Sequence, residues 1–413
     1  MRKLRIFIKT LTVVSLALSI GVFGAIAVLQ NKICENYKLQ KGEALKLNSI
    51  LPITAKYKGS KESISNTHNV GDSFDVDLKL FGVIPFSSTT VEVVDEMYVA
   101  VLGNPFGMKI YTDGVLVIEL SNVLSEGKTK NPAKKAGLEV GDYIKKANGV
   151  QITTNEDLSE VVMNSAGAQI ELEVLRNKKT IFLKLNPVKS DEDGLFHAGV
   201  WVRDSSAGIG TLTFYSPLTN IVCGLGHGIC DTDTGELLEL MSGELVEASI
   251  VSIVKGANGS PGELKGKFTY NILSNIALNN QDGVYGILKS GLSGATLTEV
   301  ALKQEVKDGA AQILCTVDGN TPKLYSCEIS LRTANYRQPT QNLVVKITDK
   351  ELLSKTGGIV QGMSGSPILQ NGKLVGALTH VLVDDCTKGY GIFAENMLET
   401  AQSVSEKQLK EVS

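Results

Sequence analysis

Clusters of basic residues are missing from most of this 413-residue chain, whose 41 Lys and Arg and 44 Asp and Glu give a net charge of −3. Binding to nucleic acid needs clustered Lys and Arg, and no basic patch stands out beyond the first ten residues. The sequence also has no phosphate-binding loop and no cluster of metal ligands. We therefore expect no nucleic acid partner, no metal and no other cofactor.

Aromatic residues are sparse as well, at 6%, and Trp201 is the single tryptophan. Long amphipathic helical patterns are absent, except near Asn396 to Glu411. Glycines are abundant, with 41 against 10 prolines, which favours many tight turns over long helices. The composition therefore predicts a mainly β fold, and the length suits two or three domains.

The six cysteines include no pair with C-x-x-C spacing, which argues against a zinc site or a thioredoxin-like motif. Cys223 and Cys230 lie on either side of His227, and Cys315 and Cys327 are twelve residues apart. Either pair could form a disulfide in an oxidising compartment. Free buried thiols are the alternative.

The N-terminus carries four basic residues, followed by an uncharged stretch from Thr10 to Gln30. About 20 apolar residues in a helix span roughly 30 Å, the thickness of a bilayer core. We expect residues 1–30 to form a cytoplasmic stub and a transmembrane anchor, with the rest of the chain outside the cytoplasm. A cleaved signal peptide is the alternative, because Ala25-Ile26-Ala27 is an A-x-A site. In both interpretations the body of the chain is exported from the cytoplasm.

Residues 31–90 carry no strong motif, and we interpret them as a juxtamembrane segment. The residues from Phe74 to Leu78 alternate in polarity like a strand. The run from Leu78 to Ile84 predicts a strand that ends at Pro85.

Residues 91–187 read as one compact unit. Residues 132–149 contain the string P-A-x-x-A-G-L-x-x-G-D-x-I-x-x-x-N-G. Ala133 and Ala136 suit one packed helical turn, and Gly137 suits its left-handed end. A second helix is expected from Asp157 to Met163, with Thr154 or Asn155 as its N-cap. The segment resembles a PDZ domain, and a glycine-rich structural unit is the alternative.

PDZ domains bind an extended peptide as an added strand. The resemblance places the loop that receives a terminal carboxylate at Phe106, Gly107 and Met108, which follow Pro105. The alternative is a PDZ domain that only packs against its own protease.

Residues 188–413 are interpreted as a second domain, which begins with a charged linker that reaches Gly194. From residue 195 onward the chain has many short strand patterns with regularly spaced turns, which predict a sandwich or a barrel. Within this domain, residues 358–367 read G-I-V-Q-G-M-S-G-S-P. That string resembles the nucleophile loop of trypsin-like serine proteases, whose fold is a double β-barrel.

A serine nucleophile must project from a tight turn, and nearby backbone N–H groups must converge on the developing oxyanion. Gly362 and Gly365 leave room for such a turn. By resemblance, Ser364 is the nucleophile, and the N–H groups of Gly362 and Ser364 form the oxyanion hole. An ordinary Gly/Ser turn is the alternative.

A serine nucleophile also needs a base. Of four histidines (His68, His197, His227 and His380), we predict His227, which lies in the glycine-rich sequence G-L-G-H-G upstream of Ser364. For the acid that orients the base, the residues leave open Asp231, Asp233, Asp282 and Asp349. His380 follows the nucleophile by sixteen residues, where it could favour an acidic substrate side chain, and a structural histidine is the alternative.

The order of these features, with the string that continues P-I-L-Q-N-G-K-L-V-G-A-L-T-H, resembles the SpoIVB peptidase family (stage IV sporulation protein B). The resemblance implies the triad His227, Asp349 and Ser364. It also implies an enzyme in the forespore membrane that faces the intermembrane space. Such an enzyme cleaves itself and a membrane-bound regulator of an intramembrane metalloprotease, and thereby triggers processing of a late mother-cell sigma factor precursor.

Two other functional interpretations remain. One is a catalytically inactive PDZ scaffold of the cell envelope. The other is a quality-control protease of the HtrA type, which is disfavoured because such enzymes place the PDZ domain after the catalytic domain.

Overall fold

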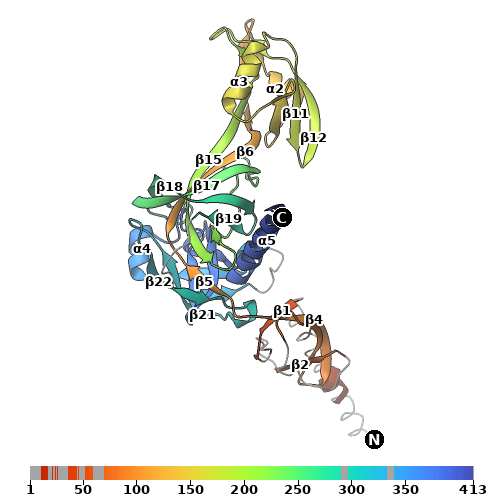
Figure 1. The fold of residues 1–413 in the computed structure, drawn as a ribbon, viewed down its shortest axis with the longest axis vertical. Helices are drawn as coiled ribbons and strands as arrows, with labels where there is room; N and C mark the ends of the chain where they lie inside the picture. The colour runs from red at the N-terminus through yellow and green to blue at the C-terminus, as the bar shows by residue number, and fades with distance from the viewer. Residues whose placement is uncertain are drawn as a thin grey trace.

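The computed structural model describes residues 36–43, 45, 52–58, 69–289, 296–332 and 339–412, together with the helical residues 11–16, 21, 24 and 26. Within these residues the chain is mainly β and forms an elongated molecule with three parts (Figure 1). A small sheet near the N-terminus lies at one end, the unit predicted to be a PDZ domain lies at the other, and two β-barrels lie between them.

The predicted membrane anchor falls mostly on residues that the structure does not describe. In the part of the chain that is described, no helix is both long enough and apolar enough to cross a membrane.

The segment interpreted as juxtamembrane contains a sheet with the strand order β1-β4-β3-β2. The predicted strand from Leu78 to Ile84 is wrong, because the chain reverses within it. Phe81 and Gly82 have φ values of 52° and 75°, which form the turn between β3 and β4. The bounds of the strands are β1 Asn36–Gln40, β2 Ile53–Tyr57, β3 Ser73–Leu80 and β4 Ile84–Val94.

The predicted PDZ unit forms around the local signals that its sequence carries. Asn131 caps the short helix α2 (Pro132–Ala136), which ends at Gly137 with φ 88°. Thr154 caps α3 (Asn155–Asn164) through a capping box with Asp157. Both helices therefore match the expectation from sequence. The strands of the unit are β7 Val123–Ser125, β8 Lys128–Lys130, β9 Tyr143–Ala147, β10 Val150–Gln151, β11 Ile170–Arg176, β12 Lys179–Leu185, β13 Val188–Lys189 and β14 Phe196–His197.

Two long strands, β6 (Pro105–Leu120) and β15 (Val200–Ser216), run from the PDZ unit into the first barrel (Figure 1). They pair antiparallel with each other over most of their length. The far half of β6 also pairs with β9 of the PDZ unit, and its near half pairs with β17 of the barrel. The two units therefore share a continuous two-stranded ribbon.

The first barrel is a ring in the order β6-β17-β18-β19-β16-β15, which the pairing of β15 with β6 closes. Phe106, Met108 and Ile110 alternate along β6 and pack into the core of this ring. The peptidase unit therefore includes part of the segment 91–187 that we assigned to the PDZ domain. The further strands are β16 Ile221–Gly224, β17 Leu240–Val254, β18 Glu263–Asn280 and β19 Gly283–Leu288, with β5 Tyr98–Val101 and β20 Leu297–Glu299 alongside.

The expected carboxylate-binding loop at Phe106, Gly107 and Met108 is wrong for the same reason. These residues lie in the middle of a sheet, between β15 on one side and β17 on the other. Phe106 is fully buried, and its side chain fills the barrel core. A strand that is paired on both edges cannot receive a peptide terminus.

The second barrel closes in the order β21-β22-β23-β26-β25-β24, so the structure contains the two barrels that the trypsin-like resemblance implied. A hairpin at Asn371-Gly372 joins β24 to β25, with φ values of 52° and 82°. Helix α5 (Ala394–Val412) follows the last strand and packs on both barrels. The bounds are β21 Gly309–Cys315, β22 Lys323–Leu331, β23 Leu343–Ile347, β24 Pro367–Gln370, β25 Lys373–Leu382 and β26 Asp385–Phe393, with α4 at Lys350–Thr356.

Candidate active site

The nucleophile string forms a turn between α4 and β24 of the second barrel. Gly362 and Gly365 have φ values of 95° and 93°, a region that favours glycine. A Cβ atom on Gly365 would lie 1.9 Å from the backbone oxygen of Thr211, so no larger residue fits at this position. The turn therefore leaves Ser364 half-buried at the surface that faces the first barrel.

Strand β15 of the first barrel holds this turn with three hydrogen bonds. The N–H of Thr211 donates to Ser364 O at 2.9 Å, and its Oγ1 donates to Gly362 O at 2.9 Å. The Oγ1 of Thr213 donates to Gly365 O at 2.7 Å. Our sequence analysis missed both threonines. Their spacing of two along a strand was the available signal, because it places both side chains on one face.

The backbone N–H groups of the turn divide into two sets. Those of Met363 and Gly365 donate to Val360 O at 3.2 Å and to Leu378 O at 2.7 Å. Those of Gly362 and Ser364 make no hydrogen bond with any residue that the structure describes. The two unused donors are the pair predicted to form the oxyanion hole, and donors held ready in this way stabilise a developing negative charge.

His227 follows a strained turn that ends β16. Leu225 and Gly226 both have φ 67°, which is uncommon for a leucine and marks a constrained segment. The Nδ1 atom of His227 lies 2.8 Å from Gly228 O and donates to it, so Nε2 carries the lone pair that can accept a proton. Burial lowers the pKa of His227 from its ordinary value of 6.5.

Ser364 and His227 contact two consecutive residues of β25. The hydroxyl of Ser364 donates to Thr379 O at 2.6 Å. The next residue, His380, stacks its ring on that of His227, with the ring centroids 4.6 Å apart. No hydrogen bond joins Ser364 to His227 in the described residues, so the hydroxyl has to turn away from Thr379 O before His227 can take its proton.

His380 therefore lies beside the predicted base, a position that our sequence analysis did not give it. Burial, with a smaller effect of His227, lowers the pKa of His380 to about 4. The ring is neutral at pH 7 and offers no positive charge to an acidic substrate side chain. Of the other two histidines, His197 lies in the PDZ unit, where it pairs with Asp193 at 2.8 Å. His68 lies outside the described residues.

Asp349 lies at the N-terminus of α4 and acts as its N-cap. Its carboxylate accepts the N–H groups of Glu351 and Leu352 at 2.9 and 3.0 Å, and that of Ser326 at 3.3 Å. These backbone donors, led by Leu352, lower the pKa of Asp349. None of its hydrogen bonds reaches His227, so its role as the triad acid stays a prediction.

The other carboxylates considered for the triad also have separate partners. Asp231 and Asp233 both pair with Arg203. Asp282 lies 3.4 Å from the hydroxyl of Thr400 in α5, and burial raises its pKa. The atom that orients His227 in this structure is therefore a backbone carbonyl, that of Gly228.

The cysteines of both candidate disulfides are free thiols. Cys223, Cys315 and Cys327 are buried, and Cys230 is exposed. Burial raises the pKa of Cys223 well above its ordinary range and that of Cys327 to about 12, so these thiols are inert apolar groups at neutral pH.

The fold and the site together define a serine peptidase that carries a PDZ domain. Residues 194–398 match the family model described as SpoIVB peptidase S55, and residues 101–186 match that of a PDZ domain. The peptidase part of the chain therefore belongs to the SpoIVB peptidase S55 family.

Three solved structures have partial similarity to the chain. The PDZ domain of an SdrC-like protein from Listeria monocytogenes is 18% identical, with 22% of this chain and 87% of that one covered and a TM-score of 0.19. The thermostable serine protease AL20, from an extremophilic microorganism, is 12% identical, with 49% and 92% covered and a TM-score of 0.28. An inactive mutant form of Rv3671c from M. tuberculosis is 15% identical, with 49% and 83% covered and a TM-score of 0.25.

Proposed function

We propose that this protein is an exported, membrane-tethered serine endopeptidase that acts in sporulation signalling. Its substrates would be the chain itself and a membrane-bound regulator of an intramembrane metalloprotease. Cleavage of that regulator would trigger processing of a late mother-cell sigma factor precursor. Membership of the SpoIVB peptidase family supports this assignment, as does the basic N-terminus followed by an apolar stretch. The compartment would be the forespore membrane, with the body of the chain in the intermembrane space.

The observation that carries the catalytic part is the pair of unused N–H groups beside Ser364. In the proposed reaction the Oγ of Ser364 attacks the scissile carbonyl carbon, and its proton moves to Nε2 of His227. The carbonyl oxygen becomes an oxyanion, which accepts the N–H groups of Gly362 and Ser364. His227 then gives the proton to the leaving amine, and water hydrolyses the acyl-enzyme by the same route.

Self-cleavage tests this proposal directly. The chain without residues 1–30 is compared on a denaturing gel with its Ser364→Ala and His227→Ala variants. We expect the parent to shorten with time and both variants to stay intact. If all three remain intact, labelling of Ser364 by a fluorophosphonate distinguishes a latent enzyme, which labels, from an incorrect catalytic assignment, which does not. Equal shortening of all three would also contradict the mechanism.

A second experiment tests the biological part. The wild-type chain and the Ser364→Ala variant are each produced in a sporulating host that lacks its own copy. The proposal requires that only the wild type restores processing of the sigma factor precursor. Restoration by the Ser364→Ala variant would show that the signalling role does not depend on peptidase activity.

A further inference from the structure

The peptide unit between Gly228 and Ile229 lies between the predicted base and one buried side chain. Its carbonyl, Gly228 O, accepts the Nδ1 proton of His227 at 2.8 Å. Its N–H, which belongs to Ile229, donates to the side-chain Oδ1 of Asn279 at 2.8 Å. The C=O and N–H of a trans peptide lie in one plane and point in opposite directions. The acceptor of the N–H therefore fixes the direction in which the carbonyl points at His227.

Asn279 is the source of that acceptor. It lies near the end of β18 and is only 8% exposed. Its Nδ2 donates to Ile229 O at 3.1 Å and to Leu238 O at 3.0 Å. The amide oxygen and both amide protons are therefore engaged, all of them on the loop that follows His227. Rotation of the amide would break these bonds, so its oxygen stays directed at the N–H of Ile229.

The backbone after β18 also packs tightly on the segment that carries His227. A Cβ atom on Gly228 would lie 2.6 Å from Asn280 O, so no larger residue fits there without a shift of the backbone. A Cβ atom on Gly283 would lie 2.8 Å from Gly224 O. The turn between β18 and β19 is therefore held against the backbone on both sides of the base.

The Gly228 carbonyl is a neutral acceptor in the place where a triad uses a carboxylate. Among the described residues, no carboxylate forms a hydrogen bond or an ion pair with His227, whereas this carbonyl does bond to its Nδ1. An acceptor at Nδ1 selects the tautomer and orientation of the ring. Hydrogen bonds in a chain polarise one another, so a bond from the N–H of Ile229 to Asn279 strengthens the acceptor at the other end of the peptide.

We infer that Asn279 is a positioning residue for catalysis. It holds the peptide between Gly228 and Ile229 so that the carbonyl keeps the proton of His227 on Nδ1, which leaves Nε2 free to take the proton of Ser364. Asn279 does not touch the substrate and acts only through this peptide. The inference deepens the proposed function, because it rests on His227 as the base, but the tautomer of that ring can be measured without catalysis.

Nitrogen-15 NMR reads the tautomer, because it distinguishes a ring nitrogen that carries a proton from one that does not. The full chain in detergent is labelled at histidine and carries Ser364→Ala, which leaves the partners of His227 unchanged because no hydrogen bond joins the two residues. Spectra are recorded at about pH 8, well above the ordinary histidine pKa of about 6.5. The His227 signal is the one that disappears in a His227→Ala variant.

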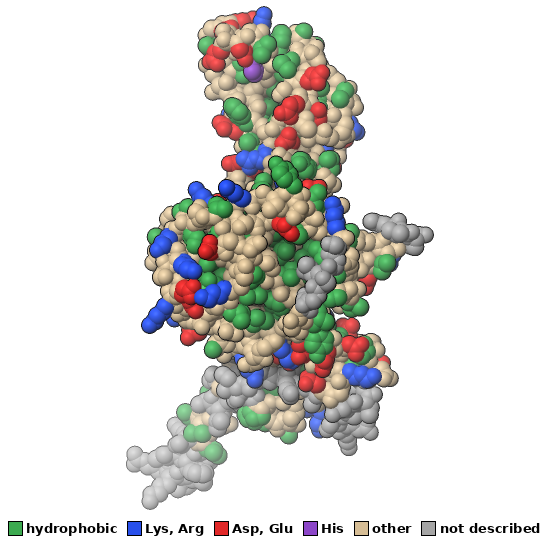
Figure 2. All heavy atoms as spheres, turned by 60° about the vertical axis from the view of Figure 1, so that its left-hand side comes forward, with side chains coloured by type: hydrophobic (Ala, Val, Ile, Leu, Met, Phe, Trp, Pro, Cys, Tyr) green, Lys and Arg blue, Asp and Glu red, His purple; other side chains and the backbone are tan. Residues whose placement is uncertain are grey.

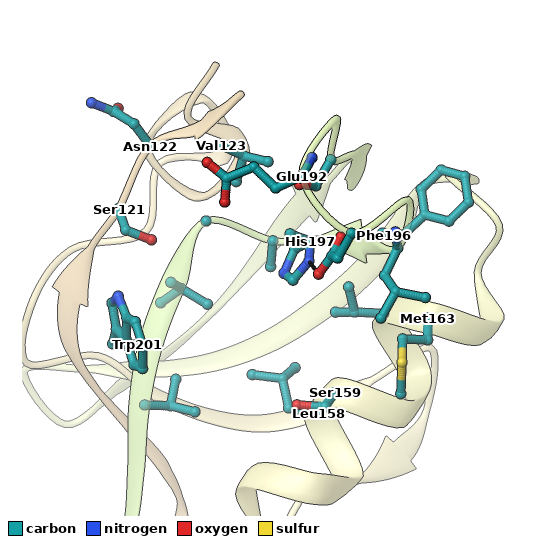
Figure 3. Close-up of a pocket in the computed structure, with 18 of the residues that line it drawn as sticks. Ser121, Asn122, Val123, Leu158, Ser159, Met163, Glu192, Phe196, His197 and Trp201 are labelled. Carbon is teal, nitrogen blue, oxygen red and sulfur yellow. Dashed lines mark hydrogen bonds and ion pairs between the residues drawn. The ribbon is translucent and has the colours of Figure 1, made fainter. Parts of the chain in front are cut away.

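His197 gives an internal reference in the same spectra. It lies in the PDZ unit, where it pairs with Asp193. Figure 2 shows a histidine side chain at the PDZ end of the molecule, away from the two barrels. Figure 3 shows the ring of His197 at a cavity of the PDZ unit, with Glu192 nearby. The His197 signal should therefore stay the same in every variant of the peptidase unit.

The main variant is Asn279→Leu, which is close in volume and removes all three hydrogen bonds of the side chain. We expect the share of His227 rings with a proton on Nδ1 to fall and the other tautomer to appear. In the chain with Ser364 intact, the rate of fluorophosphonate labelling should fall about tenfold, less than the factor of about 10⁴ that a fully wrong tautomer costs. Asn279→Val, which suits a strand and also lacks an acceptor, serves the same test if Asn279→Leu does not unfold cooperatively.

Two further variants separate positioning from stability. Asn279→Asp keeps an oxygen for the N–H of Ile229, so it should keep the wild-type tautomer even though it loses both donors. Asn342→Leu is the matched control, because Asn342 is also buried, at 4% exposure, and its Oδ1 accepts Phe393 N at 3.4 Å. This control should lower the thermal unfolding midpoint as Asn279→Leu does, and leave the His227 signal unchanged.

Four results would overturn the inference. They are a wild-type His227 without a proton on Nδ1, an Asn279→Leu variant that keeps the wild-type tautomer, an Asn279→Asp variant that loses it as Asn279→Leu does, and an Asn342→Leu variant that loses it equally. A wild-type chain that fluorophosphonate does not label would contradict the proposed function instead. The tautomer would still decide the role of Asn279, since it is read in the Ser364→Ala background.

Discussion

The hydroxyl of Thr213 offers the sharpest test of how the two barrels cooperate. Thr213 is fully buried in the first barrel, and its Oγ1 donates to the carbonyl of Gly365, the residue after the nucleophile, at 2.7 Å. Thr213→Val keeps the shape of the side chain and removes only this donor. The carbonyl of Gly365 is then left without the bond, which costs about 1–3 kcal/mol.

Both stability and reactivity should respond. For a domain of this size, about 2 kcal/mol corresponds to a fall of about 4–8 °C in the unfolding midpoint. The turn also carries the two oxyanion donors, and complete loss of one such donor costs about 10²–10³ in rate. A turn that is loosened rather than broken should therefore lose about tenfold in the rate at which a fluorophosphonate labels Ser364.

The assay compares wild type, Thr213→Val and Thr213→Ser for the labelling rate, and the same substitutions in a Ser364→Ala background for thermal unfolding. Thr213→Ser keeps the hydroxyl, so it should label at close to the wild-type rate. Two results would refute the reasoning. One is a Thr213→Val variant that is less stable but labels normally, which would confine the bond to stability. The other is a Thr213→Ser variant that is as slow as Thr213→Val, which would show that the hydroxyl is not the cause.

Four further predictions concern His227, Asp349 and His380. Catalysis needs neutral His227, and burial lowers the pKa of this histidine. The acid limb of the pH–rate profile should therefore have its midpoint below pH 6.5. A midpoint above pH 6.5 would contradict the buried position of His227. Asp349→Ala removes the cap of α4 and should lower the free energy of unfolding by about 1 kcal/mol in a denaturant titration. Asp349→Asn keeps a capping oxygen, and if Asp349 is the triad acid as predicted, the variant should lose about 10⁴ in kcat with normal stability. A kcat within about twofold of wild type would confine Asp349 to capping α4. His380→Ala should not change which substrate residue the enzyme prefers on the N-terminal side of the scissile bond, because the His380 ring is neutral at pH 7. A changed preference in a peptide-library digest would contradict this.

The parts of the structure that could be predicted are those that neighbouring residues determine. The helix at residues 132–136 ends where Gly137 adopts a left-handed conformation, and Thr154 caps the next helix with Asp157. Such caps and turns depend on residues three or four positions apart, so the sequence displays them directly. The nucleophile turn belongs to the same class, since Gly362 and Gly365 are required by its φ angles.

The parts that could not be predicted depend on pairing between distant segments. A carboxylate-binding loop was expected at Phe106, Gly107 and Met108, yet these residues lie inside β6, which begins at Pro105. Its partners, β15 and β17, lie about a hundred or more residues away, and no local signal gives their register. The contacts of Asp349 were missed for a related reason. Its distance from Ser364 along the chain does not say which side of the barrel it faces.

The length of strand β15 also limits which substrates one molecule can hold. Val200 lies at the PDZ end of β15, and Thr211 holds the backbone of Ser364. Eleven residues of extended strand separate them, which at about 3.3 Å per residue is roughly 35 Å. A substrate that occupies both places at once must cover this length, so its docking segment and its scissile bond must be at least about eleven residues apart. The length of β15 therefore sets a minimum spacing between the docking segment and the scissile bond. A substrate with a shorter spacing must be bound by the PDZ domain of one molecule and cleaved by the peptidase site of another.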